Sequence, residues 1–322
     1  MLELKNKVAF VSGAGTVGPG WGNGKATAVP IGRMGDAWNV AHAILFLVTM
    51  IRHLLTMLIR TLTQIVVIAL AMAASLAALA QEPIGIVIMH GKGGSPSGLV
   101  AELARTLESE GYVVANLDMP WSGRRNYDVD VGHAEQEVAA ALAGFRNKGA
   151  KRVFVAGHSQ GGIFALHLAG KLEADGYVTI APGGNVANRV FRENVGSWLV
   201  RARQLVADGK GHERATLGDY EGAKGAYLVQ AVPAAYVTWF DPDGAMNMDR
   251  AVRSVSPRVP ILWVAPIRDY PGLIKSALPL FRDLPANRFT RLYQPDADHR
   301  GAPTAAADEI ARWIREVAGG AQ

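Results

Sequence analysis

The chain has 322 residues, of which 49% are hydrophobic and 19% are charged, a composition typical of a globular protein. It contains no cysteine, which excludes disulfides, thiolate metal sites and a cysteine nucleophile. The net charge of +5 is uneven, because residues 1–80 hold six basic and two acidic residues while residues 81–322 hold 27 and 26. The basic excess lies mostly at the N-terminal end and does not indicate a nucleic-acid-binding surface.

The first 49 residues open with a strand-like run at residues 8–11 and a glycine-rich loop. The glycines are Gly13, Gly15, Gly18, Gly20, Gly22 and Gly24. This pattern resembles the cofactor-binding opening of short-chain dehydrogenases, in which such a loop lets a pyrophosphate approach a helix N-terminus. Residues 30–47 resemble a segment near the C-terminal end of that family, so the central sheet and the catalytic Tyr and Lys are missing. One strand and two helices cannot complete a doubly wound sheet. We therefore interpret residues 1–49 as a truncated, non-functional remnant, or as an upstream frame joined to a second gene.

Residues 50–80 have the three parts of a secretory signal peptide. Two arginines come first, residues 65–80 form an apolar run, and the run ends in Ala-Leu-Ala at Ala80. We expect export to the periplasm or the medium, with cleavage after Ala80. Because signal peptides open a chain, translation could start at Met50 or Met57. Otherwise the uncleaved helix would anchor the protein to a membrane.

From residue 81 onward, apolar β-type runs alternate with helical patterns. The expected strands are 84–89, 112–117, 153–156, 177–180, 261–265 and 288–293, and the expected helices are 99–110, 133–147 and 304–317. This alternation predicts one α/β domain at 81–322, with a mostly parallel central sheet flanked by helices. Residues 183–232 are more polar and less regular, and they could form a small cap.

The stretch that is most informative about function follows the third expected strand. Residues 157–161 read Gly-His-Ser-Gln-Gly, a G-x-S-x-G sequence between a strand and a helical pattern. A sharp turn in this context forces its middle residue into a strained backbone, and glycines are needed where side chains would collide. Ser159 is therefore the candidate nucleophile, at a helix N-terminus where negative charge is favoured.

Together, residues 83–318 resemble the α/β-hydrolase family, in which nucleophile, acid and histidine follow one another along the chain. The resemblance implies a Ser159-His299 pair, because His299 lies between the last expected strand and the last expected helix. It implies Asp269 as the acid, since Asp269 follows the penultimate expected strand.

Three other aspartates are alternatives for the acid. Asp241 and Asp243 follow a strand-like run at residues 235–239, and both remain candidates. Asp298 adjoins His299 in sequence and is poorly placed to accept a hydrogen bond from the Nδ1–H of that histidine.

The oxyanion hole of this chemistry needs two backbone donors. The resemblance assigns one to Gln160, which follows the nucleophile. The second belongs to the loop after the first expected strand, where residues 90–94 read His-Gly-Lys-Gly-Gly and resemble the family's His-Gly loop. We assign it to the N–H of Lys92.

These parts predict a serine hydrolase that acts on small-molecule carboxylic esters or thioesters through an acyl-enzyme, without a metal or organic cofactor. The alternatives are a non-catalytic binding protein with this fold and, at the N-terminal end, an NAD(P)-dependent dehydrogenase. The substrate itself does not follow from the fold.

Overall fold

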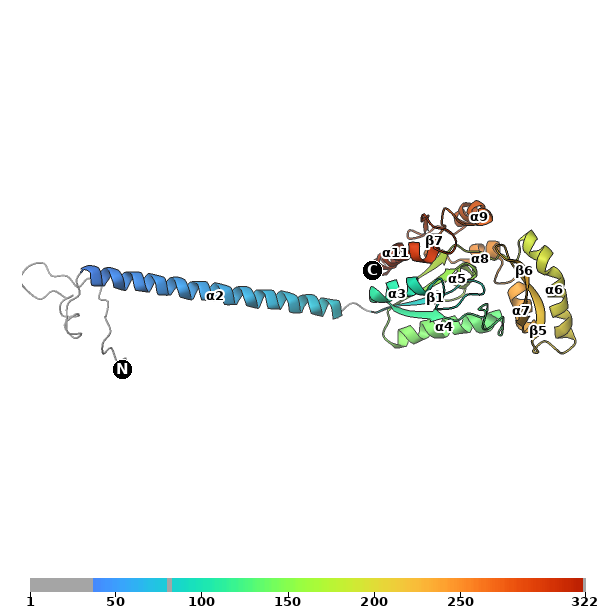
Figure 1. Ribbon diagram of the computed structural model, residues 1–322, viewed down its shortest axis with the longest axis horizontal. Coiled ribbons are helices and arrows are strands. Elements are labelled where there is room, and N and C mark those ends of the chain that lie inside the picture. The colour runs from blue at the N-terminus through green and yellow to red at the C-terminus, as the bar shows by residue number, and fades with distance from the viewer. Residues whose placement is uncertain (1–36, 80–82, 321–322) are drawn as a thin grey trace, which may run out of the picture. The chain divides into compact units, whose positions relative to one another are not determined.

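The computed structural model describes residues 37–79 and 83–320. The chain divides into two compact units, Met1–Gln81 and Glu82–Gln322 (Figure 1). The dehydrogenase-like loop at residues 13–24 and the expected cleavage point at Ala80 lie outside the described residues.

In the first unit, one long helix, α2, runs over Ala37–Leu79. Its segment Ile44–Leu70 is long and apolar enough to cross a membrane, and none of its residues is buried. A signal sequence has the same properties, so the helix is compatible with either role. The helix also continues through Met50, so the expected boundary between residues 49 and 50 is not a break in secondary structure.

The second unit is built on a six-stranded parallel sheet, as the alternating pattern predicted. In chain order the strands are β1 Ile84–Met89, β2 Val113–Leu117, β3 Arg152–His158, β4 Gly176–Ile180, β7 Ile261–Val264 and β8 Arg291–Tyr293. Their order across the sheet is β2-β1-β3-β4-β7-β8, and every neighbouring pair is parallel. The carboxyl ends of all the strands therefore share one edge, where ligands bind in open α/β sheets.

Helices cover both faces of the sheet. One face packs against α4 Val131–Asn147, α5 Gln160–Ala169 and α8 Met248–Ser254, and the other against α3 Ala101–Ser109, α10 Ala302–Ala305 and α11 Ala307–Gly319. The helix α9, Pro271–Arg282, follows β7. An apolar core lies on each face of the sheet. In β1, Val87 and Met89 pack into the core on the α4 side, while Ile86 and Ile88 pack into the core on the α3 side. This alternation is the two-residue period of a strand that is buried on both faces.

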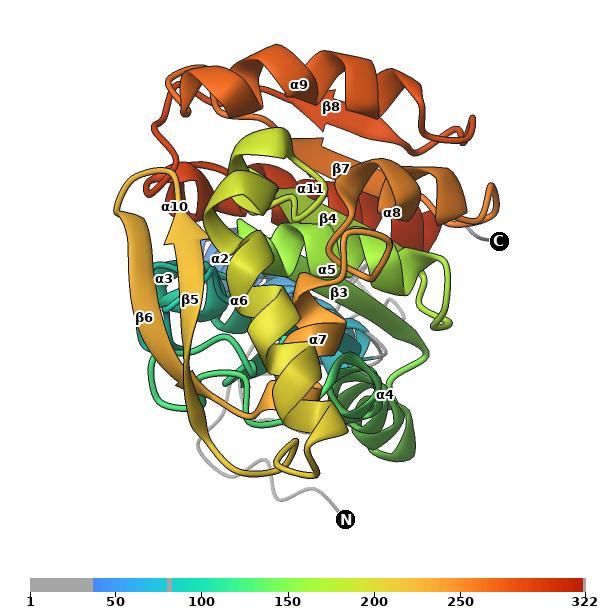
Figure 2. The same ribbon diagram turned by 90° about the vertical axis from the view of Figure 1, so that its right-hand side faces the viewer.

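Between β4 and β7 the chain forms a cap-like segment, which we call the cap and define as residues 189–240. It contains α6 Arg189–Ala207, an antiparallel hairpin of β5 Ala215–Glu221 and β6 Gly225–Ala231, and α7 Pro233–Phe240 (Figure 2). Residues 183–232 are thus more regular than their composition suggested.

The strand-like run at residues 235–239 is wrong as a strand, because it lies within α7. Pro233 stands at the start of this helix, where a fixed φ and a missing N–H favour helix initiation. Tyr236 and Phe240 are four residues apart and stack at 4.0 Å between ring centroids. In a helix, residues four apart lie one turn from each other on the same face, whereas in a strand the same two residues would be about 13 Å apart and could not stack.

Candidate active site

The turn between β3 and α5 holds Ser159 in a strained conformation, as predicted. Its φ is 54° and its ψ is −114°, which is unusual for a residue with a side chain. A Cβ at Gly157 would lie 2.0 Å from the carbonyl oxygen of Gly161, and one at Gly161 would lie 2.7 Å from that of Met89. Both glycines are therefore required by close backbone approach.

His299 lies between Ser159 and Asp269. Its Nε2 is 3.0 Å from Ser159 Oγ, and its Nδ1 is 2.8 Å from Asp269 Oδ1. A carboxylate only accepts, so Nδ1 carries the proton and the unprotonated Nε2 faces the serine hydroxyl. Asp269 follows β7 and His299 follows β8, so the two neighbouring strands of the parallel sheet bring the acid and the histidine to one edge.

Two of the other three aspartates, Asp241 and Asp298, are engaged elsewhere. Asp241 directly follows α7, just beyond the cap, and accepts from the N–H of Asp243 at 3.1 Å. Asp298 accepts from the N–H of Gly301 at 2.7 Å. Within residues 83–320, none of these three carboxylates forms a hydrogen bond with His299.

The His-Gly loop after β1 is fixed by its own histidine. His90 is buried, and its Nε2 accepts from the N–H of Met119 at 3.0 Å, so its Nδ1 donates to the carbonyl of Gly91 at 2.8 Å. Burial lowers the pKa of His90, which favours this neutral form. The indole N–H of Trp121 donates to the His90 carbonyl at 2.8 Å. The loop is thereby held in one conformation.

The two expected oxyanion donors are next to the nucleophile in the fold. A Cβ at Gly91, the neighbour of Lys92, would lie 3.1 Å from Ser159 Cβ. Gln160 is the first residue of α5, where backbone N–H groups have no partner within the helix. Across residues 83–320, the N–H groups of Lys92 and Gln160 donate to no protein acceptor. Both are therefore available to an oxyanion.

His158 is a site residue that the sequence analysis did not single out. Its Nε2 donates to the carbonyl of His299 at 2.9 Å, and the two rings lie 5.0 Å apart between centroids. Burial, followed by repulsion from His299 when that ring is protonated, lowers the pKa of His158 to about 4. A neutral His158 thus holds the backbone of His299. Its position directly before the nucleophile was the available signal.

The side chain of Lys92 also has a role that its loop position did not reveal. Lys92 Nζ donates to Asp219 Oδ1 at 2.6 Å, in the hairpin of the cap, and both side chains are buried. The other oxygen, Asp219 Oδ2, accepts from the hydroxyls of Tyr127 and Tyr227 at 2.9 and 3.0 Å. This network ties the His-Gly loop to the cap.

No cluster of three or more His, Cys, Asp or Glu side chains that could hold a metal occurs among the described residues.

Comparison with known proteins supports an α/β-hydrolase. The model of a family described as serine aminopeptidase, S33, matches residues 81–217. That match includes Ser159 and ends before Asp269 and His299. No functionally curated protein matches the chain.

Several solved structures have the same fold. A monoacylglycerol lipase from Paleococcus ferrophilus is 18% identical, with a TM-score of 0.52 over 72% of this chain and 94% of that chain. The α/β hydrolase GrgF from Penicillium sp. sh18 is 15% identical, with a TM-score of 0.57 over 74% and 91%. A soluble variant of monoglyceride lipase from Saccharomyces cerevisiae is 18% identical, with a TM-score of 0.50 over 74% and 88%. The second unit thus has the α/β-hydrolase fold, and the family match supports an α/β-hydrolase enzyme.

Proposed function

We propose that the protein is a serine hydrolase of carboxylic esters or thioesters, with Ser159 as nucleophile, His299 as general base and Asp269 as the acid. The observation that carries the proposal is the pair of hydrogen-bond distances at His299, 3.0 Å to Ser159 Oγ and 2.8 Å to Asp269 Oδ1. Strained backbone of this kind is concentrated at functional sites, and a serine that is hydrogen-bonded to a histidine and through it to a carboxylate has the arrangement of a nucleophile.

The reaction follows from this geometry. His299 Nε2 takes the hydroxyl proton while Ser159 Oγ attacks the carbonyl carbon, and Asp269 stabilises the imidazolium that forms. The tetrahedral oxyanion accepts from the N–H groups of Lys92 and Gln160, where the loss of one donor costs about 3 kcal/mol. The intermediate collapses, and the leaving alcohol or thiol takes its proton from His299. Water then attacks the acyl-enzyme by the same route and releases the acid.

Esters suit the site better than peptides with a free amino terminus, although the matching family is described as an aminopeptidase. The ammonium group of a peptide substrate is bound best by a carboxylate that has no other partner. The pocket beside the triad is lined by apolar side chains, Ser276 and one carboxylate, Asp269, which is already paired with His299. Two of the similar structures are described as monoglyceride or monoacylglycerol lipases, which is consistent with ester chemistry.

The test is active-site labelling together with turnover. A fluorophosphonate should label Ser159, identified by peptide mass spectrometry, and p-nitrophenyl acetate should be hydrolysed. Ser159→Ala should lose both properties and keep the unfolding midpoint of the parent. Labelling without turnover would favour the non-catalytic binding protein, and wild-type turnover of Ser159→Ala would exclude this mechanism.

For the N-terminal part, we propose that residues 50–80 direct export, with cleavage after Ala80, and that residues 1–49 have no function in hydrolysis. The apolar, solvent-exposed segment Ile44–Leu70 supports a membrane-targeting role. If no cleavage occurs, the same helix would attach the hydrolase to a membrane.

A further inference from the structure

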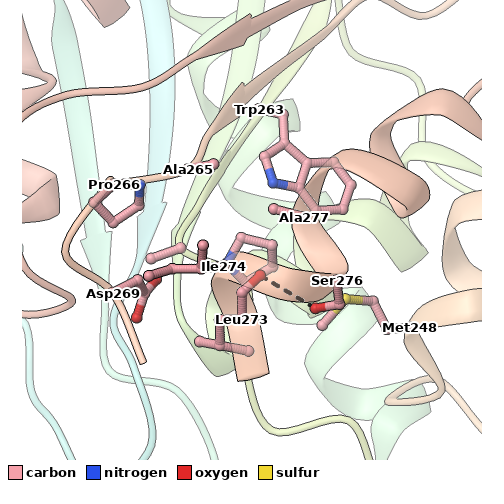
Figure 3. A pocket seen from close by; sticks show the side chains of 11 residues that line it. Met248, Trp263, Ala265, Pro266, Asp269, Leu273, Ile274, Ser276 and Ala277 are labelled. Atoms are coloured by element: carbon pink, nitrogen blue, oxygen red, sulfur yellow. Dashed lines mark hydrogen bonds between the residues drawn. The ribbon is translucent and has the colours of Figure 1, made fainter. Parts of the chain in front are cut away.

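A small pocket lies beside the triad acid, between α9 and the carboxyl ends of β4 and β7 (Figure 3). Its volume is about 270 Å³ when the open solvent in front of it is included. Besides Asp269, its lining includes Met248, Trp263, Pro266, Leu273, Ile274 and Ala277. Pockets for drug-sized ligands measure about 300–1,000 Å³. Because the 270 Å³ includes open solvent, the enclosed part of this pocket is much smaller than that, and it admits a short apolar group and not a whole lipid.

The pocket adjoins the nucleophile through Gly183. A Cβ at Gly183 would lie 3.2 Å from Leu273 Cδ1, in the pocket wall, and 3.6 Å from Ser159 Oγ. Only the width of a methyl group therefore separates the pocket wall from the reacting oxygen. A substituent of an ester bound at Ser159 can pass over Gly183 and enter the pocket.

One wall of the pocket carries a buried hydrogen-bond donor without a partner. Trp263 is 1% exposed, and within residues 83–320 its Nε1 has no acceptor. The other fully buried tryptophans, Trp121, Trp239 and Trp313, each donate to a backbone carbonyl at 2.8 Å. In Figure 3 the indole nitrogen of Trp263 faces the space between the lining residues. Because buried donors are nearly always paired, this one indicates a ligand acceptor.

We propose that this pocket binds a short apolar substituent of the substrate, and that the N–H of Trp263 donates to an oxygen on that substituent. The inference rests on the proposed ester hydrolysis and specifies its substrate class. The substrate would be a small ester whose short chain carries an ether, keto or hydroxyl oxygen. The chain could belong to the acid or to the alcohol, since the carbonyl carbon at Ser159 bears both.

The test compares esters that differ only by an oxygen in place of a methylene. On the acid side the pair is p-nitrophenyl methoxyacetate and p-nitrophenyl butanoate. On the alcohol side it is 2-methoxyethyl acetate and butyl acetate. Trp263→Phe keeps a large ring and removes the donor. In one of the two pairs, Trp263→Phe should lower the ether-to-alkyl ratio of kcat/KM about tenfold. The reason is that the hydrogen bond from the indole N–H can form only with the ether oxygen, so its loss affects the ether ester alone. Because this ether-to-alkyl ratio in the variant is compared with the same ratio in the parent, the difference in intrinsic reactivity between the two esters cancels.

Trp313→Phe is the matched control, because it removes a buried indole donor on the opposite face of the sheet. It should leave both ratios unchanged. Ala277→Leu tests the same pocket without altering Trp263. It should shift the preferred chain length downward, with about a tenfold loss for the longest accepted chain relative to acetate. Unchanged ratios in both pairs for Trp263→Phe, or an unchanged chain-length profile for Ala277→Leu, would overturn the pocket assignment. If Ser159 is labelled in those variants, the proposed hydrolase stands and only this inference fails.

Discussion

Asp269 accepts the Nδ1 proton of His299 at 2.8 Å and is nearly buried. We predict that Asp269→Asn lowers kcat for p-nitrophenyl acetate by about 10⁴, because an amide in that position favours the wrong imidazole tautomer. Asp241→Asn and Asp243→Asn, just after the cap, should stay within about threefold of the parent. Steady-state kinetics on the three variants measures these changes in kcat. A large loss of kcat in Asp241→Asn, together with a small loss in Asp269→Asn, would make Asp241 the acid instead.

His158 makes stability depend on pH. Its pKa falls from 6.5 to about 4 on folding, chiefly because it is buried. The unfolded chain therefore binds a proton between these pH values and the folded chain does not, so stability is full above pH 6.5 and is lost as the pH falls to 4. At about 1.4 kcal/mol per pKa unit, the loss amounts to about 3 kcal/mol.

Urea denaturation from pH 4.5 to 7.5 measures this loss. His158→Gln can still donate to the His299 carbonyl but does not titrate, so it should flatten the pH dependence. His212→Gln, at an exposed histidine in the turn after α6, should leave the dependence as it is in the parent. An equal slope for His158→Gln and the parent would mean that other groups govern the acid instability.

At the level of single residues, local context in the sequence predicted the triad candidates. It did not predict the side-chain contacts that hold the surrounding loops in place. Ser159, His299 and Asp269 each follow a recognisable strand, and that position together with the resemblance to α/β-hydrolases made them the candidates. The contact between Lys92 and Asp219 joins residues 127 positions apart and follows no spacing rule. The hydrogen bond from His158 depends on how the His299 loop folds back, which sequence periodicity does not encode.

Among the elements, the cap was the part least accessible from sequence. The sheet strands are short and mainly apolar, and turn residues bound them, which favours strands over helices. In the cap, the apolar run at residues 235–239 has no clear period, and the structure has a helix there because Tyr236 and Trp239 must both be buried. The order β2-β1-β3-β4-β7-β8 likewise depends on long-range pairing and was not predicted.

The Lys92–Asp219 ion pair is the link between the His-Gly loop and the hairpin of the cap. The Lys92 side chain is 8% exposed and that of Asp219 1%, and the ammonium also lies over the rings of Phe191 and Phe240. Asp219→Asn would leave a buried charge without its counter-ion. We predict a loss of about 3–5 kcal/mol in the free energy of unfolding. A lower kcat should accompany it, because the N–H of Lys92 would be less well positioned.

The same hairpin offers the matched control. Glu221 pairs with Lys224 at 2.8 Å, but Lys224 is largely exposed. Glu221→Gln should therefore cost no more than about 1 kcal/mol. Chemical denaturation of both variants, with Lys92→Met and the Lys92→Met/Asp219→Asn double variant, gives the coupling energy of the buried pair. Strictly additive losses would refute a direct link between loop and cap.

In the whole molecule, the fold and the proposed chemistry belong to one unit. The α/β alternation predicted that fold from residue 81 onward, and the structure confirms it. The residues of the triad, the His-Gly loop and the pocket beside Asp269 all lie within Glu82–Gln322. The dehydrogenase-like resemblance rests on residues outside the described part of the chain and remains a sequence interpretation.

A chain that begins at Gln81 should therefore hydrolyse esters as fast as the full chain. The sheet of the second unit has helices on both faces, so it needs no surface from residues 1–80 to complete its core. Started at Met50, the protein should be exported and cleaved after Ala80, which N-terminal sequencing of the exported form would detect. Isothermal titration of the full chain with NAD(H) and NADP(H) should give no binding, since a glycine-rich loop without the rest of its sheet cannot form a dinucleotide site. Micromolar binding of either nucleotide, or slower ester hydrolysis after deletion of residues 1–49, would mean that the N-terminal part is a working component of the protein.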